Sequence, residues 1–306
     1  MTGTAPRADV WVVVEHIPGW GDAPLARSGH GVRILMARGR REGPGPGFTT
    51  PTRPVDGTDG TDSTDGTRLV DVTDVTVTPQ PLDAGVRVWV GYAAGDPALR
   101  VGLIERPEDV AGWDLAAIAA GSLRGWGRPD PDPLLLVCAN GRRDRCCGHA
   151  GGRLADTLWS GPLADRVLTC THLGGHRFAP TALLLPVGAL HGRLDEQTSS
   201  DLITGASTGR MRADTLRGFS TLDPPAQVAE AHARTVTGYG GLDPLEVSLV
   251  AGADADHVTA DVQVRDALAA TRALRIQLER TTVQARLACG RDPEPTTHWH
   301  PTGHPT

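Results

Sequence analysis

Short apolar runs and alternating segments dominate the first part of the chain. Residues 10–16 (VWVVVEH) are almost continuously apolar, as in a buried strand, and residues 32–38 (VRILMAR) form a second apolar stretch. Residues 68–77 and 86–92 alternate apolar and polar side chains with the period of two that suits a half-buried sheet. We therefore expect a β-rich N-terminal domain over residues 1–125.

One segment interrupts this domain. Residues 41–67 are rich in Gly, Pro, Asp and Thr, and they end in the repeat DGTDGTDSTDGT. Its aspartates could suggest a calcium loop, but no glutamate closes the repeat at the spacing that an EF-hand needs. Because the segment has few apolar residues to bury, we expect a disordered surface insertion here.

The pattern changes at residue 134, where LLLV predicts a short buried strand that ends on Cys138. The following elements alternate between helix and strand, and they end in a hairpin with a tight turn at Gly188. In chain order, the elements expected after this strand are a Gly/Arg-rich loop, a helix at 149–159, a strand at 166–171, and two strands at 182–187 and 189–194. This order is typical of a thioredoxin-like α/β domain, which we place at 133–237, after a helix in 106–122 and a linker at 125–133.

The remaining residues form a C-terminal α/β extension at 238–306. An amphipathic helix at 224–236 precedes it and is expected to cover the sheet. Within the extension we expect a helix at 243–250 and strand-like segments at 257–265 and 273–287. A flexible tail is expected from residue 291, where histidines alternate with prolines. The predicted fold class is therefore α/β in element order, or α+β in the broad sense.

The amino-acid composition excludes several classes of protein function. All 30 basic residues are arginine, which excludes lysine Schiff bases and the P-loop lysine. A formal charge of −6 argues against a general nucleic-acid-binding protein. No apolar run reaches the roughly 20 residues of a membrane span, and no secretory signal is visible. We therefore expect a cytoplasmic protein that binds neither nucleic acid nor membrane.

Four of the five cysteines fall within 33 residues, and an odd total does not suit a disulfide framework. Cys138 and either Cys146 or Cys147 lie in one loop, and His172 and His176 lie in a second loop. Both loops follow predicted strands, which would hold the side chains rigidly. Two thiolates and two imidazoles suit either a structural zinc ion or a 2Fe–2S cluster, and spacing alone does not separate the two.

The strings CANGRRDRCCG and THLGGHRFAPTALLLP strongly resemble the sucrase/ferredoxin-like family of thioredoxin-like 2Fe–2S ferredoxins. The segments GTAPRADVWVVVEHIPGWG and LRGFSTLDPPAQVAE resemble other parts of that family, so the likeness spans most of the chain. It implies a thioredoxin-like ferredoxin domain at 133–237 with a 2Fe–2S cluster. The implied ligands of the cluster are Cys138, Cys147, His172 and His176.

The resemblance also selects Cys147 over Cys146, because the family's second cysteine is followed directly by glycine. Four further residues are expected around the cluster: Arg143, Asp144, Cys146 and Arg177. Cys170 shares the strand face of His172 and is expected in the core or beside the ligands.

Histidine ligation predicts the redox behaviour. Neutral imidazoles leave the oxidised site with about zero net charge, so it accepts an electron more readily than a site with four thiolates. Proton uptake on imidazole would make the potential depend on pH. We therefore expect an electron carrier or redox sensor rather than a stand-alone enzyme, with a redox partner protein such as a flavoprotein reductase. The alternative is a zinc-stabilised Cys2His2 binding module without redox activity.

Overall fold

The computed structural model of the chain describes residues 1–15, 26–27, 32–39, 85–252, 254–265 and 271–303. The expected insertion at 41–67 and the expected strand at 68–77 lie outside these residues. No helix within the described ranges is long and apolar enough to cross a membrane.

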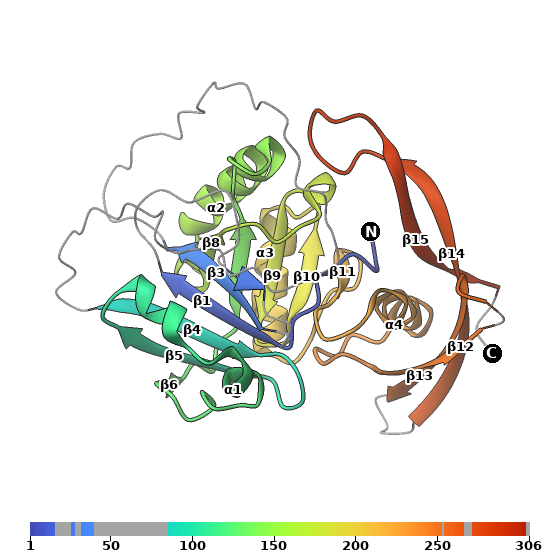
Figure 1. Cartoon of the computed structure of the whole chain (residues 1–306), viewed down its shortest axis with the longest axis horizontal. Helices are drawn as coiled ribbons and strands as arrows, with labels where there is room; N and C mark the ends of the chain where they lie inside the picture. Colours follow the sequence, from blue (N-terminus) through green and yellow to red (C-terminus); the bar gives the residue numbers. More distant parts are fainter. Residues whose placement is uncertain (16–25, 28–31, 40–84, 253, 266–270, 304–306) are drawn as a thin grey trace.

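Eleven strands of the described chain form one mixed sheet (Figure 1), in the order β11-β10-β9-β7-β8-β3-β1-β4-β5-β6, with β2 paired to β3. The strands are β1 (Val10–Glu15), β2 (Ala26–Arg27), β3 (Val32–Arg38), β4 (Val86–Tyr92), β5 (Ala98–Ile104), β6 (Arg128–Pro129), β7 (Leu134–Cys138), β8 (Val167–Cys170), β9 (Thr181–Leu185), β10 (Ala189–Gly192) and β11 (Leu216–Phe219). The predicted strands at 10–16, 32–38 and 86–92 are confirmed as β1, β3 and β4.

Within the described residues, one strand pairing joins the N-terminal strands to those of the domain expected at 133–237. β3 runs antiparallel to β8, with Ala37 opposite Cys170 and Arg38 opposite Thr169. The sheet therefore continues across the boundary expected at 125–133, where the short strand β6 lies. The helix expected in 106–122 is broken into a 3-10 helix, η2 (Pro107–Gly112), and α1 (Leu115–Ala119), because Asp114 caps the second helix by accepting from two of its backbone amides.

The predicted α+β class and the order of strand, loop, helix, strand and hairpin are confirmed. β7 and β8 are parallel and are connected through the helix α2 (Gly152–Trp159), whereas β9 is antiparallel to both β7 and β10. A third helix, α3 (Glu196–Ser207), follows β10 and was not predicted from the sequence.

The two faces of the strand β7 lie in different cores. Leu135 and Val137 point toward the apolar faces of α2 and α3. Leu134, Leu136 and Cys138 point the other way, into a core shared with the N-terminal strands. The carboxyl end of β7 therefore places Cys138 in a fully buried apolar layer.

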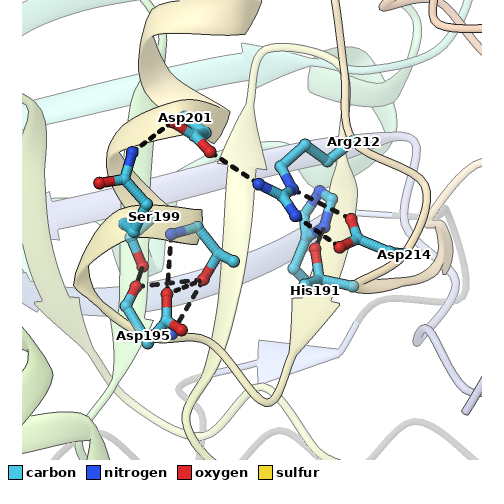
Figure 2. A network of polar contacts seen from close by, with 9 residues as sticks. His191, Asp195, Ser199, Asp201, Arg212 and Asp214 are labelled. Carbon is cyan, nitrogen blue, oxygen red and sulfur yellow. Dashed lines mark hydrogen bonds and ion pairs between the residues drawn. The ribbon is translucent and has the colours of Figure 1, made fainter.

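Polar contacts fix the hairpin and α3 (Figure 2). Asp195 caps α3 by accepting from the backbone N–H of Thr198 at 2.8 Å. Arg212 donates to Asp201 and to Asp214, each at 2.6 Å, and so ties the helix to the segment before β11. His191 of β10 is fully buried and forms a hydrogen bond through its Nδ1.

A second sheet follows the helix α4 (Pro224–Thr237), which packs between the two sheets (Figure 1). This sheet has the order β12-β13-β14-β15. Its strands are β12 (Glu246–Ala251), β13 (His257–Arg265), β14 (Thr271–Ala285) and β15 (Glu294–Thr302).

Two predictions for the C-terminal extension are wrong. Residues 243–250 do not form a helix, because the ladder between β12 and β13 pairs their backbone from Glu246 to Ala251. The tail is not flexible over its described length, because β15 pairs with β14 from Glu294 to Thr302. β15 is an edge strand, where prolines are tolerated because one side of the strand needs no backbone donor.

Candidate metal centre

The four predicted ligands come from two loops that meet at the carboxyl ends of β7 and β8. Cys138 ends β7 and Cys147 opens a π-helical turn, η3 (Cys147–Gly151). His172 follows β8, and His176 opens a short 3-10 helix, η5 (His176–Phe178). Single π-helical turns occur frequently at functional sites, because they redirect side chains within a helix.

Two groups of donor atoms overlap at one cysteine. The donor atoms of Cys138, Cys147 and His172 lie within 4.8 Å of one another, and those of Asp144, Cys147 and His176 form a second group of the same size. The structure therefore brings all four predicted ligands together, with Cys147 shared between the groups. These Cys/His groups are able to bind a metal ion.

The two imidazole rings lie side by side. The ring centroids of His172 and His176 are 4.3 Å apart, with 23° between the ring planes. The Nδ1 atoms of both rings are buried without a hydrogen-bond partner. An unsatisfied buried polar atom costs about 1–3 kcal/mol, and a bond from nitrogen to a metal would satisfy it. The histidine loop therefore fits a metal site better than a purely structural turn.

The backbone between the histidines is not helical, as expected from its glycines. Gly174 and Gly175 have φ values of +77° and +71°, a region that side chains other than glycine rarely adopt. This left-handed pair turns the chain back on itself. As a result, two residues four positions apart present their rings to the same space.

The two candidate cysteine ligands are both buried. A hydrogen bond from the Cys147 thiol and the adjacent His172 ring hold the pKa of Cys138 well below its usual range. The same hydrogen bond, together with burial, raises the pKa of Cys147. The protein therefore favours a thiolate at Cys138, which is the form of cysteine that binds metals.

Asp144 organises the loop that carries the cysteines. Its side chain is buried, and its Oδ1 accepts from the backbone N–H of Cys146 at 2.8 Å and of Cys147 at 3.4 Å. Its Oδ2 accepts from the backbone N–H of Cys289 at 3.0 Å. Asp144 was expected beside the metal, and the structure places its carboxylate in one of the two donor groups and shows it as the acceptor that shapes the cysteine loop.

A family model described as sucrase/ferredoxin-like matches residues 62–218, about half of the chain. The chain belongs to the sucrase/ferredoxin-like family. The match contains all four candidate ligands, but it excludes the opening segment and most of the LRGFSTLDPPAQVAE segment that also resemble the family. No curated protein and no solved structure matches the chain.

The other residues expected around the site of this sucrase/ferredoxin-like protein take different positions. Arg143 is exposed, and its backbone N–H donates to Asn140 at 3.2 Å. Arg177 is half-buried and contacts His298 of β15, with 3.4 Å between Nη2 and Nε2. Cys170 is buried directly beside Cys138 in the parallel register of β8 and β7, so it belongs to the core.

Sequence analysis missed one residue of the site, Arg217 of β11. Its buried guanidinium donates to the carbonyl of Gly174 at 3.1 Å and to the carbonyl of Thr4 at 2.6 Å. Burial lowers the pKa of Arg217 to about 10, and negative charge on the nearby sulfurs of Cys138 and Cys147 partly offsets this effect. Only its place in the family-like string LRGFSTLDPPAQVAE could have singled it out.

Proposed function

We propose that Cys138, Cys147, His172 and His176 hold a 2Fe–2S cluster and that the protein transfers electrons or senses redox state. The observation that carries this proposal is the convergence of two buried cysteines with two histidines whose buried Nδ1 atoms lack partners. Membership of the sucrase/ferredoxin-like family supports iron–sulfur over zinc.

The donor set determines the electrostatics of the site. A 2Fe–2S cluster takes up and releases one electron at a time, at a potential that depends on ligand charge and burial. Two thiolates bring half the negative charge of four, and the imidazoles are neutral. The buried guanidinium of Arg217 adds a positive charge close by. Both features favour the reduced state, so the potential should lie well above that of four-cysteine ferredoxins.

The histidines also offer a place for a proton. A ligating imidazole uses one ring nitrogen, and its second nitrogen remains free to carry or release a proton. Because reduction adds negative charge beside the ring, it should raise the pKa of that nitrogen. We expect the reduction potential to fall as pH rises through this pKa. A redox titration at several pH values measures the effect, and a potential that is constant from acid to alkaline buffer would refute it.

The decisive experiment is spectroscopy of the purified protein. A red-brown preparation, with a Rieske-like EPR signal after reduction and stoichiometric iron and sulfide, would support the proposal. Cys138→Ala should lose the visible absorbance, whereas the buried neighbour variant Cys170→Ala should keep it. A colourless protein with stoichiometric zinc would instead establish the zinc-stabilised Cys2His2 module.

A redox partner is proposed from the surface around the cysteine loop. Arg142, Arg143 and Arg145 are exposed, while Asp144 between them is buried. This loop therefore presents positive charge to a docking protein with an acidic surface, such as a flavoprotein reductase. Electron transfer from such a reductase should slow at high salt, because ionic strength screens the attraction. A reducing, cytoplasmic location would keep the cysteines available as ligands.

A further inference from the structure

Two cysteines outside the candidate ligand set are held at the edge of the metal centre. Cys146 precedes Cys147, and Cys289 lies in the loop between β14 and β15, which curls toward the main sheet (Figure 1). The carboxylate of Asp144 accepts hydrogen bonds from the backbone of both cysteines. Asp144 accepts from the backbone N–H of Cys146 through Oδ1 at 2.8 Å and from that of Cys289 through Oδ2 at 3.0 Å. Two residues far apart in sequence are thereby fixed on a single side chain.

The two side chains also touch. The Cys146 thiol donates a hydrogen bond to the sulfur of Cys289, and this contact, with burial and the Asp144 charge, raises the pKa of Cys146 to about 12. A disulfide needs two cysteines whose Cα atoms lie roughly 4.4–6.8 Å apart and whose side chains converge. The backbones of Cys146 and Cys289 are held by one carboxylate and their side chains are in hydrogen-bonding contact, so the two side chains converge as a disulfide requires.

The other cysteines are not comparable partners for an oxidant. Cys138 and Cys147 are the proposed ligands and are fully buried, and Cys170 is fully buried in the core. Cys289 is exposed and Cys146 is half-buried. Because thiol oxidation follows exposure, a small oxidant in solution would reach Cys289 first, with Cys146 beside it.

The hairpin of β14 and β15 touches both loops of the metal centre. Cys289, in its connecting loop, contacts Asp144 of the cysteine loop. His298, in β15, contacts Arg177 of the histidine loop. A covalent bond at Cys289 would therefore fasten this hairpin across the loops that carry the proposed ligands.

We propose that Cys146 and Cys289 form a reversible disulfide with a low-molecular-weight disulfide, such as glutathione disulfide, as oxidant. The Cys289 sulfur attacks one glutathione sulfur, which forms a mixed disulfide and releases one glutathione thiolate. The Cys146 sulfur then attacks the Cys289 sulfur and releases the second. The two protein thiols lose two electrons and two protons, and one glutathione disulfide becomes two glutathione molecules.

The bond would regulate the metal centre. Cys146 is the immediate neighbour of Cys147, so release of the metal requires the segment that contains both residues to move. A disulfide to the hairpin restrains that movement, and the oxidised protein should hold its metal longer. This consequence rests on the proposed metal site, whereas formation of the disulfide does not.

The test uses the full-length protein in buffers of defined glutathione to glutathione disulfide ratio. Remaining thiols are alkylated, the protein is digested with trypsin, and the peptides are identified by mass spectrometry. The expected product links residues 146–153 (CCGHAGGR) to residues 287–291 (LACGR). Fragmentation assigns the bond to Cys146 rather than Cys147. Alkylation of both thiols in fully oxidising buffer, or a bond from Cys289 only to glutathione or to Cys147, would overturn the proposal.

Matched variants separate this result from the cluster. Cys146→Ser and Cys289→Ser should each abolish the linked peptide, and Cys170→Ser should retain it. Loss of metal to EDTA should be several-fold slower for the oxidised wild type than for oxidised Cys289→Ser, and equal rates would overturn the regulatory part. The linked peptide is detected whether the site holds iron or zinc, whereas the cluster is detected by absorbance. Failure of one proposal is therefore distinguishable from failure of the other.

Discussion

The guanidinium of Arg217 donates a hydrogen bond to the carbonyl oxygen of Gly174 at 3.1 Å and so ties β11 to the loop that carries both histidines. The guanidinium also packs tightly against Gly175, because a Cβ atom at that position would collide with it. A single buried cation thus supports the backbone of the histidine loop and lies near the candidate cysteine ligands.

Replacement of this cation should lower the reduction potential of the metal centre. Arg217→Gln removes a positive charge that favours the reduced state, so we expect a fall on the order of tens of mV. It also leaves the carbonyls of Gly174 and Thr4 without donors, which should cost about 2–4 kcal/mol of stability. Redox titration and urea unfolding measure the two effects. Arg212→Gln is the matched control, since its half-buried guanidinium pairs with Asp201 and Asp214 outside the metal centre. An equal shift of the reduction potential in both variants would contradict an effect of the Arg217 charge on the metal centre.

Exchange of a histidine for a cysteine should keep the cluster and change its potential. In His176→Cys a thiolate replaces a neutral imidazole, which adds one negative charge to the site. We expect a coloured protein whose potential is lower by on the order of 100 mV or more and depends less on pH. His149→Gln, an exposed position in η3, should leave both properties unchanged. A His176→Cys protein with visible absorbance and an unaltered potential would exclude His176 as a ligand.

The sequence was sufficient to predict the central strands and to group the candidate ligands. The strands β1 and β7 are almost continuously apolar because both of their faces are buried, and β3 and β4 are apolar at most positions; these patterns are local. The ligands were found for a different reason. Cysteines and histidines at the ends of strands have few structural uses in such density, so their chemistry grouped them as candidates without knowledge of the fold, and the family resemblance then selected Cys147 over Cys146.

Elements that depend on distant partners were not predictable. β12 and β15 are stabilised by hydrogen bonds to β13 and β14, and nothing within their own residues specifies those ladders. Arg217 is 43 residues from Gly174, and Cys289 is 145 residues from Asp144. Such contacts arise only when the sheet and the C-terminal hairpin are assembled, and local periodicity contains no information about them.

Close packing between the π-helical turn and β7 should make one of two adjacent glycines indispensable. A Cβ atom at Gly151 would collide with the carbonyl oxygen of Cys138, whereas a Cβ atom at Gly152 would meet nothing within 4 Å. Gly151→Ala should therefore displace the cysteine loop, lower stability by about 1–3 kcal/mol and reduce metal content. Gly152→Ala should be neutral or stabilising by up to about 1 kcal/mol, because alanine favours a helix. Urea unfolding and metal analysis compare the pair, and equal behaviour of the two variants would show that this contact does not constrain the loop.

His191 should make the protein sensitive to acid. Its ring is buried in β10 with Nδ1 hydrogen-bonded to Thr215 Oγ1 at 3.0 Å, and burial lowers its pKa to about 3. In the unfolded chain the same group has a pKa near 6.5, so the unfolded state binds a proton in a pH range where the folded state does not. Its contribution to stability is present above about pH 6.5. It is lost by about 1.4 kcal/mol per pH unit as pH falls toward 3.

The variant His191→Asn tests this contribution, because an amide can keep the hydrogen bond to Thr215 but does not titrate. Urea unfolding between pH 4.5 and 7.5 should show a shallower loss of stability for His191→Asn than for the wild type. The control is His257→Asn, an exposed position where the neighbouring Asp254 raises the pKa. A raised pKa stabilises the folded state at acid pH and loses that effect as pH rises, so this variant should not reduce the acid sensitivity. If His191→Asn and the wild type have parallel pH profiles, His191 is protonated in the folded protein at acid pH, and the acid sensitivity must come from other groups whose pKa is lowered in the folded state, such as the partly buried His232.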